Sequence, residues 1–105
     1  MEQPNLSYIE EMSAGNKIFQ QKIINIIKNE FPQEKSEYFL NFKNKDFKLT
    51  ADNVHKLKHK ISILGLEKSY QIAIDYENNL IEGKTILSDE FEIILNTISD
   101  YLKSI

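Results

Sequence analysis

The stretch 50–66, TADNVHKLKHKISILGL, decides the expected fold because it contains an apolar stripe and a polar stripe, both at helical spacing. At 3.6 residues per turn, one face collects apolar side chains. These are Val54, Leu57, Ile61 and Leu64. A second face collects polar and titratable side chains, namely His55, Lys58, His59 and Ser62. The pattern predicts a helix that buries the first stripe in a core and leaves the second stripe in water.

Helical spacing also precedes this stretch. Apolar residues three apart within 6–12 predict a short N-terminal helix of one or two turns. Further apolar residues predict a long helix over about 15–44, with Ser13 or Asn16 available as its N-cap. Pro32 falls inside that range and lacks an amide donor. We therefore expect the long helix to be kinked, or divided into two abutting helices, at this proline.

Capping residues and a glycine mark the start and the end of the predicted central helix. Thr50 or Asp52 can cap the central helix. Gly65 is placed to end it, since glycine tolerates the left-handed conformation found at helix C-termini. Apolar residues spaced three and four apart over 66–82 then predict another helix. Because only a tight turn separates the two, they are expected to lie antiparallel.

A last helix is predicted by the apolar stripe within 91–102, with Ser88 or Asp89 as its cap. No segment alternates apolar and polar residues between turn signals, so no strand is required. The predicted fold is all-α: an up-down-up-down four-helix bundle with a short extra N-terminal helix. A chain of 105 residues with no composition shift predicts a single domain, 1–105.

Composition and charge exclude several classes of protein. Hydrophobic residues make up 41% of the chain and charged residues 28%, which is typical of a globular protein rather than a disordered one. The absence of cysteine removes disulfides, thiol catalysis and cysteine-ligated metal sites. A net charge of -3 disfavours nucleic acid as a general partner, because nucleic-acid binding requires a basic surface.

The chain also lacks the sequence signals of membrane insertion or export. No run approaches the roughly 20 apolar residues that a membrane-spanning helix needs. The first residues, MEQPNLSYIEEM, are acidic where a secretory signal would be basic and then apolar. We therefore expect a protein of the cytoplasm, with no membrane partner.

The polar stripe of the central helix has chemistry that suits phosphate. A neutral imidazole on an exposed helix face is a competent nucleophile near neutral pH, because one ring nitrogen has a free lone pair. Lys58 lies one turn beyond His55, and its ammonium could pair with an anion delivered there. Ser62 adds a possible hydrogen-bond donor on the next turn.

The order of these residues resembles the histidine-containing phosphotransfer (HPt) family. That family has a histidine, a lysine three residues later, a small residue next, and Gly-Leu or Gly-Ala about a turn and a half beyond. Here these positions are His55, Lys58, His59 and Gly65-Leu66. His59 is a departure, because the family usually has glycine there to let the partner protein approach closely.

Two further features of the chain look like the same family. Ala73 and Glu77 lie together on the following predicted helix, and Phe31-Pro32 marks a kink in the preceding one. The resemblance extends over nearly the whole chain, although only the segment 55–66 is specific.

The resemblance implies a phosphorelay intermediate rather than an enzyme. His55 would accept a phosphoryl group from the aspartate of a receiver domain in a hybrid sensor histidine kinase and pass it to a response regulator. The receiver would supply Mg²⁺, so no cofactor is expected on this chain. Lys58 would offset charge on the phosphoryl group, while His59, Ser62 and Gly65 would form its surroundings. We expect the protein to act as a monomer.

Two other functions are compatible with the same residues. The chain could be a helical adaptor that binds a receiver or kinase domain without being phosphorylated. It could also be a small metal-binding bundle, because His55 and His59 have the i, i+4 spacing of two zinc ligands. The zinc pattern HExxH requires glutamate after the first histidine, however, and that residue is Lys56. We therefore predict no metal site.

Overall fold

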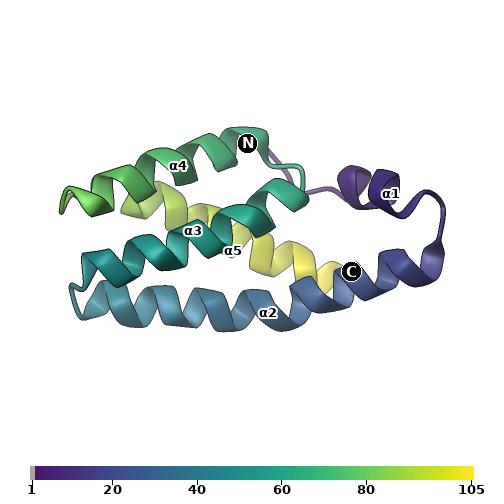
Figure 1. Ribbon diagram of the computed structural model, residues 1–105, viewed down its shortest axis with the longest axis horizontal. Coiled ribbons are helices and arrows are strands. Elements are labelled where there is room, and N and C mark those ends of the chain that lie inside the picture. The colour runs from purple at the N-terminus through teal and green to yellow at the C-terminus, as the bar shows by residue number, and fades with distance from the viewer. Residues whose placement is uncertain (1) are drawn as a thin grey trace.

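The computed structural model describes residues 2–105, which form five helices and no strand, so the predicted all-α class is confirmed. The helices are α1 (Ser7–Ser13), α2 (Lys17–Lys43), α3 (Phe47–Ile63), α4 (Glu67–Ile81) and α5 (Ser88–Ser104). Figure 1 shows α3 between α2 and α4, and it packs against both of them. Residue 1, which the predicted domain includes, lies outside the described residues.

None of the helices between residues 2 and 105 combines the length and the apolar character that a bilayer crossing requires.

The helix α2 is continuous through Pro32, so the predicted division into two helices does not occur. Its N-cap is Asn16, one of the two predicted caps, whose side chain accepts a hydrogen bond from the amide of Phe19 at 3.0 Å. A proline inside a helix costs about 3 kcal/mol. Two aromatic side chains of the same helix, Phe31 and Tyr38, are fully buried and contribute about 1.5–3 kcal/mol each, which offsets that cost.

The central helix α3 begins earlier than the sequence pattern predicted. Its N-cap is Asp46, whose carboxylate accepts a hydrogen bond from the amide of Leu49 at 3.1 Å. The predicted caps are therefore wrong: Thr50 and Asp52 lie inside the helix. The Thr50 hydroxyl instead donates a hydrogen bond of 2.7 Å to the backbone carbonyl of Asp46.

The predicted caps of the last helix are also wrong. Ser88 and Asp89 are its first two helical residues, and the N-cap position is occupied by Leu87, which has no side-chain oxygen. The carboxylate of Asp89 still lies in the first turn, where a negative charge interacts favourably with the helix dipole.

The apolar stripe of α3 forms the centre of the core, as predicted. Val54, Leu57, Ile61 and Leu64 each have 0% of their surface exposed. They belong to one cluster with buried residues of the other helices, including Ile9, Ile27, Phe31, Tyr38, Ala73, Tyr76, Leu80, Phe91, Leu95 and Ile98. Because this stripe is enclosed on all sides, the rotation of α3 about its axis is fixed. The polar stripe is therefore presented in a defined direction.

The turn between α3 and α4 is built around Gly65. Its φ angle is +77°, which glycine adopts at little cost, and it follows the C-cap residue Leu64 as predicted. The N-terminal segment joins this turn, because the amide of Asn5 donates a hydrogen bond of 2.9 Å to the carbonyl of Leu64. The side chain of Asn5 lies directly against Gly65, where a Cβ atom would be only 2.6 Å from its Nδ2 atom.

Glu2 caps the following helix from outside. Its carboxylate accepts hydrogen bonds from the amides of Lys68 and Ser69, at 2.9 and 3.0 Å, in the first turn of α4. Partial burial alone would raise the pKa of the Glu2 carboxyl, but the hydrogen bonds from these two amides outweigh it, so the pKa is below its usual value. The start of the described chain is thus tied to the α3–α4 turn.

Candidate functional site

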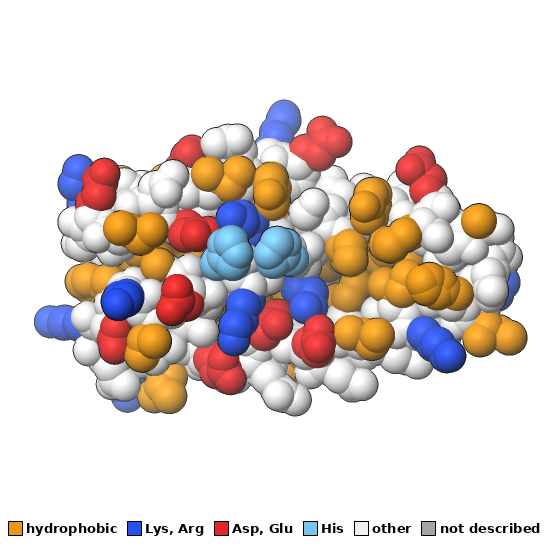
Figure 2. Space-filling model, in the orientation of Figure 1, with side chains coloured by type: hydrophobic (Ala, Val, Ile, Leu, Met, Phe, Trp, Pro, Cys, Tyr) orange, Lys and Arg blue, Asp and Glu red, His pale blue; other side chains and the backbone are white. Residues whose placement is uncertain are grey.

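The two histidines lie next to each other on the outer face of α3. Figure 2 shows them together near the middle of one face of the molecule, with basic and acidic side chains around them. The side chain of His55 is 54% exposed, and His59 is exposed on the next turn. Their rings meet edge to face, with centroids 5.2 Å apart and planes at 89°. Ser62 is exposed one turn further on, so three of the four residues of the polar stripe face water as predicted.

A carboxylate from α4 orients the ring of His55. The Nδ1 atom of His55 lies 3.2 Å from Oε2 and 3.3 Å from Oε1 of Glu77. An ionised carboxylate only accepts hydrogen bonds, so Nδ1 must be the atom that donates. In a neutral imidazole with its proton on Nδ1, the lone pair is on Nε2. The geometry therefore leaves Nε2 as the nucleophilic atom of a partly exposed ring.

Lys58 does not lie free in solvent as the sequence pattern predicted. Its side chain is only 14% exposed, and its Nζ atom lies 3.1 Å from Oε1 of Glu77. The aliphatic stem of a lysine can cover apolar surface while its ammonium reaches a partner, and here that partner is on the adjacent helix. His55 and Lys58 thus converge on one carboxylate, which is itself 20% exposed.

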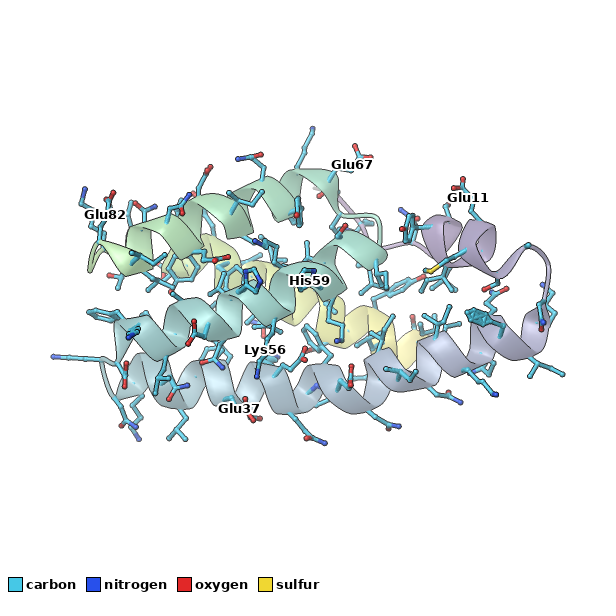
Figure 3. All side chains as sticks on the ribbon, viewed as in Figure 1. Glu11, Glu37, Lys56, His59, Glu67 and Glu82 are labelled. Carbon is cyan, nitrogen blue, oxygen red and sulfur yellow. The ribbon has the colours of Figure 1, made fainter. Side chains whose placement is uncertain are left out.

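The remaining lysines of the basic run differ in their surroundings. The Nζ atom of Lys60 lies 2.9 Å from a carboxylate oxygen of Glu30 and 3.5 Å from one of Glu34, so its charge is directed at α2 rather than at the histidines. Lys56 is exposed on the side of α3 that faces α2 (Figure 3). The basic run therefore contributes Lys58, which shares the carboxylate of Glu77 with His55, and Lys56, which lines the same surface pocket as His55.

The structure separates two candidate site residues, Ser62 and Gly65, from the others: both line a surface pocket with the N-terminal segment, and Gly65 is the farther of the two along the chain. It follows the far end of α3, beyond Ser62, and its contacts are with the N-terminal segment rather than with His55. Its role in the described structure is to terminate the helix. The side chains brought together are those of His55, Lys58 and His59.

Glu77 is the residue whose role at the site the sequence reasoning did not identify. The sequence pattern includes Glu77 only through its resemblance to a family pair with Ala73. Ala73 is fully buried one turn earlier on α4. The spacing of four residues could have indicated its position. Residues four apart lie on the same face of a helix, so a buried Ala73 places Glu77 on the side of α4 that borders α3. The distance to His55 depends on how the two helices pack, which the sequence pattern alone does not specify.

The metal-binding alternative finds no further ligands in the structure. Among residues 2–105, no three side chains of histidine, cysteine, aspartate or glutamate are grouped so that they could hold a metal ion. The two imidazoles meet edge to face, and Nδ1 of His55 is engaged with Glu77.

Comparisons with other proteins identify no relative: no family model matches the chain, and neither the curated proteins nor the solved structures give a significant match. The function is therefore argued from the geometry of the site and the chemistry of its side chains.

Proposed function

We propose that this protein is a histidine phosphotransfer protein of a two-component phosphorelay. His55 accepts a phosphoryl group from the aspartate of a receiver domain in a hybrid sensor kinase and passes it to the aspartate of a response regulator. The observation that carries the proposal is the 3.2 Å contact between Nδ1 of His55 and Glu77, with Lys58 bound to the same carboxylate. These three side chains present one oriented, nucleophilic nitrogen next to one positive charge.

The transfer step follows from the tautomer that Glu77 selects. The Nε2 lone pair attacks the phosphorus of the aspartyl phosphate, and the bond between phosphorus and the aspartate oxygen breaks. The aspartate leaves as a carboxylate, and the imidazole becomes a phosphorylated cation whose proton stays on Nδ1. Glu77 accepts the hydrogen bond from that proton, so the developing positive charge has a partner throughout. The second transfer is the same step in reverse.

Lys58 provides the positive charge on the phosphoryl side. An ammonium has three N–H donors, and Lys58 uses one of them on Glu77. The remaining donors are available to the phosphoryl oxygens once the group is on Nε2 of His55. Since the receiver domain brings Mg²⁺ and most of the electrostatic stabilisation, no cofactor is needed on this chain.

The fold suits such a carrier. We propose that α2, α3, α4 and α5 form an up-down-up-down four-helix bundle, with α1 as the extra N-terminal helix, and that the protein acts as a monomer in the cytoplasm. The receiver would dock on the face that presents the histidines. Figure 2 shows hydrophobic side chains gathered beside them on that face, toward the α1 end of the molecule. Exposed apolar residues of α1 and the first turn of α2 are Tyr8, Met12, Ile18 and Phe19.

Phosphoryl uptake tests the proposal directly. The protein is incubated with a radiolabelled, phosphorylated receiver domain and, separately, with phosphoramidate, which donates phosphate to imidazoles without a partner protein. We expect acid-labile, base-stable label on the wild type, loss of label in His55→Gln, and retention in the matched control His59→Gln. Labelling of His55→Gln at the wild-type level would exclude His55 as the acceptor. Tight receiver binding without label would instead identify an adaptor.

A further inference from the structure

A cleft lies apart from the histidines, between α2 and the C-terminal half of α5. Its volume is about 520 Å³, within the range of pockets that hold small organic ligands. Every residue that lines it belongs to one of these two helices: Lys28, Phe31, Pro32, Lys35, Ser36 and Phe39 from α2, and Ser99, Leu102 and Lys103 from α5. No residue of α3 contributes to the cleft.

The floor and one wall of the cleft are apolar. Phe31 and Leu102 are buried beneath it, with 1% and 6% of their surfaces exposed. Phe39 stands at its side with 36% of its surface exposed. An apolar body lying in the cleft would cover this ring and remove its surface from water.

Lys35 places a positive charge in the cleft without a carboxylate to balance it. Its Nζ atom donates hydrogen bonds to Oγ of Ser99 at 2.8 Å and to Oδ1 of Asn96 at 3.1 Å, and both acceptors are neutral. Partial burial and the nearby charge of Lys103 lower the pKa of Lys35, while Asp100 raises it only in part from beyond ion-pair distance. Of the three donors of the ammonium, one is left for a ligand.

Two further lysines border the same cleft. The Nζ atom of Lys28 donates a hydrogen bond of 3.1 Å to the main-chain oxygen of Ile105, the last residue of the sequence, and Lys103 is exposed. Within residues 2–105, Lys103 has no carboxylate within ion-pair distance, whereas Lys58 and Lys60 are both paired. In a chain with a net charge of -3, Lys35 and Lys103 beside an apolar floor form a local concentration of positive charge without ion-pair partners.

We propose that this cleft binds a small amphipathic anion, with its charged head at Lys35 and its aliphatic body over Phe31, Phe39 and Leu102. Two properties of the cleft favour that combination: the free donor of a partly buried ammonium, and the uncovered apolar surface beside it. A purely ionic ligand would leave the aromatic wall in water, and a purely apolar one would leave the ammonium without a counter-ion. Alkyl carboxylates and alkyl phosphates share the required chemistry.

Calorimetric titration of the full chain tests the proposal with four probes, each kept below its micelle-forming concentration. Decanoate and decyl phosphate have the required head and tail, and the stronger of the two identifies the head group. Acetate has the head alone, and decyltrimethylammonium has the tail with the opposite charge. We expect both amphipathic anions to bind and both control probes to bind at least about tenfold more weakly, the scale of one charge-assisted hydrogen bond. Equal binding of the cationic probe, or no binding of either anion, would overturn the proposal.

Variants then place the binding in the cleft. Lys35→Met removes the ammonium but keeps an unbranched side chain, and Phe39→Ala removes the exposed wall. Each is expected to weaken decanoate binding by about tenfold or more. Lys22→Met, at an exposed position of the same helix outside the cleft, should bind as the wild type does. Circular dichroism confirms that each variant is folded. Unchanged binding in both cleft variants would show that the ligand lies elsewhere.

Discussion

The Nδ1 atom of His55 lies 3.2 Å from the Oε2 atom of Glu77 on the neighbouring helix, and this contact determines which ring nitrogen can react. Glu77→Gln replaces an obligatory acceptor by an amide that can also donate, so the tautomer is no longer selected. We expect phosphoryl uptake by the variant to fall by about tenfold, the scale of a hydrogen bond to a charged group.

Phosphorus NMR of the phosphorylated wild type should show phosphate on Nε2 of the histidine, because Nδ1 is engaged. Glu67→Gln is the matched control, since Glu67 is exposed at the other end of α4 (Figure 3). Phosphate on Nδ1 in the wild type, or equal effects of the two substitutions, would contradict the role given to Glu77.

Lys58→Met keeps the aliphatic stem of the side chain and removes its charge. Because the pair with Glu77 is largely buried, its loss should reduce the free energy of unfolding by about 1.5–3 kcal/mol, the scale of a hydrogen bond to a charged group. Phosphoryl transfer should slow by about tenfold, because one charge-assisted contact to the phosphoryl oxygens is lost. Rapid-quench transfer assays and urea unfolding measure the two effects separately. A large loss of stability with normal transfer would make Lys58 a structural residue only.

His59→Gly replaces the second imidazole of α3 by the smallest residue. We expect transfer to His55 to be preserved. The ring of His59 only meets the ring of His55 edge to face, and it makes no hydrogen bond with Glu77, the carboxylate that orients His55. Glycine in the middle of α3 should reduce stability by about 1 kcal/mol. His59→Ala removes the same ring at less cost to the helix. Complete loss of transfer in both variants would make the second imidazole a working part of the site.

Gly65→Ala tests the turn after α3, and Gly83→Ala is its matched control. Both glycines have positive φ angles, +77° and +78°, so both alanines are strained by about 1–2 kcal/mol. Only at Gly65 would the new Cβ also press against Asn5, since nothing lies within 4 Å at Gly83. Urea unfolding should therefore show a larger loss of stability for Gly65→Ala. Equal losses would mean that the side chain of Asn5 moves aside freely.

Two buried phenols should make the fold sensitive to alkaline pH. The hydroxyl oxygens of Tyr38 and Tyr76 lie 2.6 Å apart, and Tyr38 also donates to Glu92 at 3.0 Å. Burial raises the pKa of Tyr76 to about 12 and raises the pKa of Tyr38 further. Their contribution to stability is complete below the unfolded-state pKa of about 10 and is lost as pH rises through the folded-state values.

Ultraviolet absorbance of phenolate measures this titration. Of the five tyrosines, these two should ionise only as helical circular dichroism is lost. Ionisation of all five near pH 10 with the helices intact would contradict the buried network.

Periodicity predicted the features of this chain that depend on burial. The stripe of α3 and its end at Gly65 were predictable, because apolar spacing and glycine geometry are local properties. The start of the helix was not, since Asp46 and Asp52 are both competent caps and the turn before the helix determines which is used. The burial of Lys58 and its contact with Glu77 were not predictable. They depend on how closely α3 and α4 pack, and the spacing within one segment does not specify that distance.

The hydrogen bonds from the first-turn amides of α4, at Lys68 and Ser69, to Glu2 have a practical meaning for any experiment on this protein. They connect the beginning of the chain to the helix that holds Glu77, although the two are far apart in sequence. A tag fused at the N-terminus is therefore attached next to a contact with that helix, so phosphoryl-transfer assays should compare tagged and untagged protein.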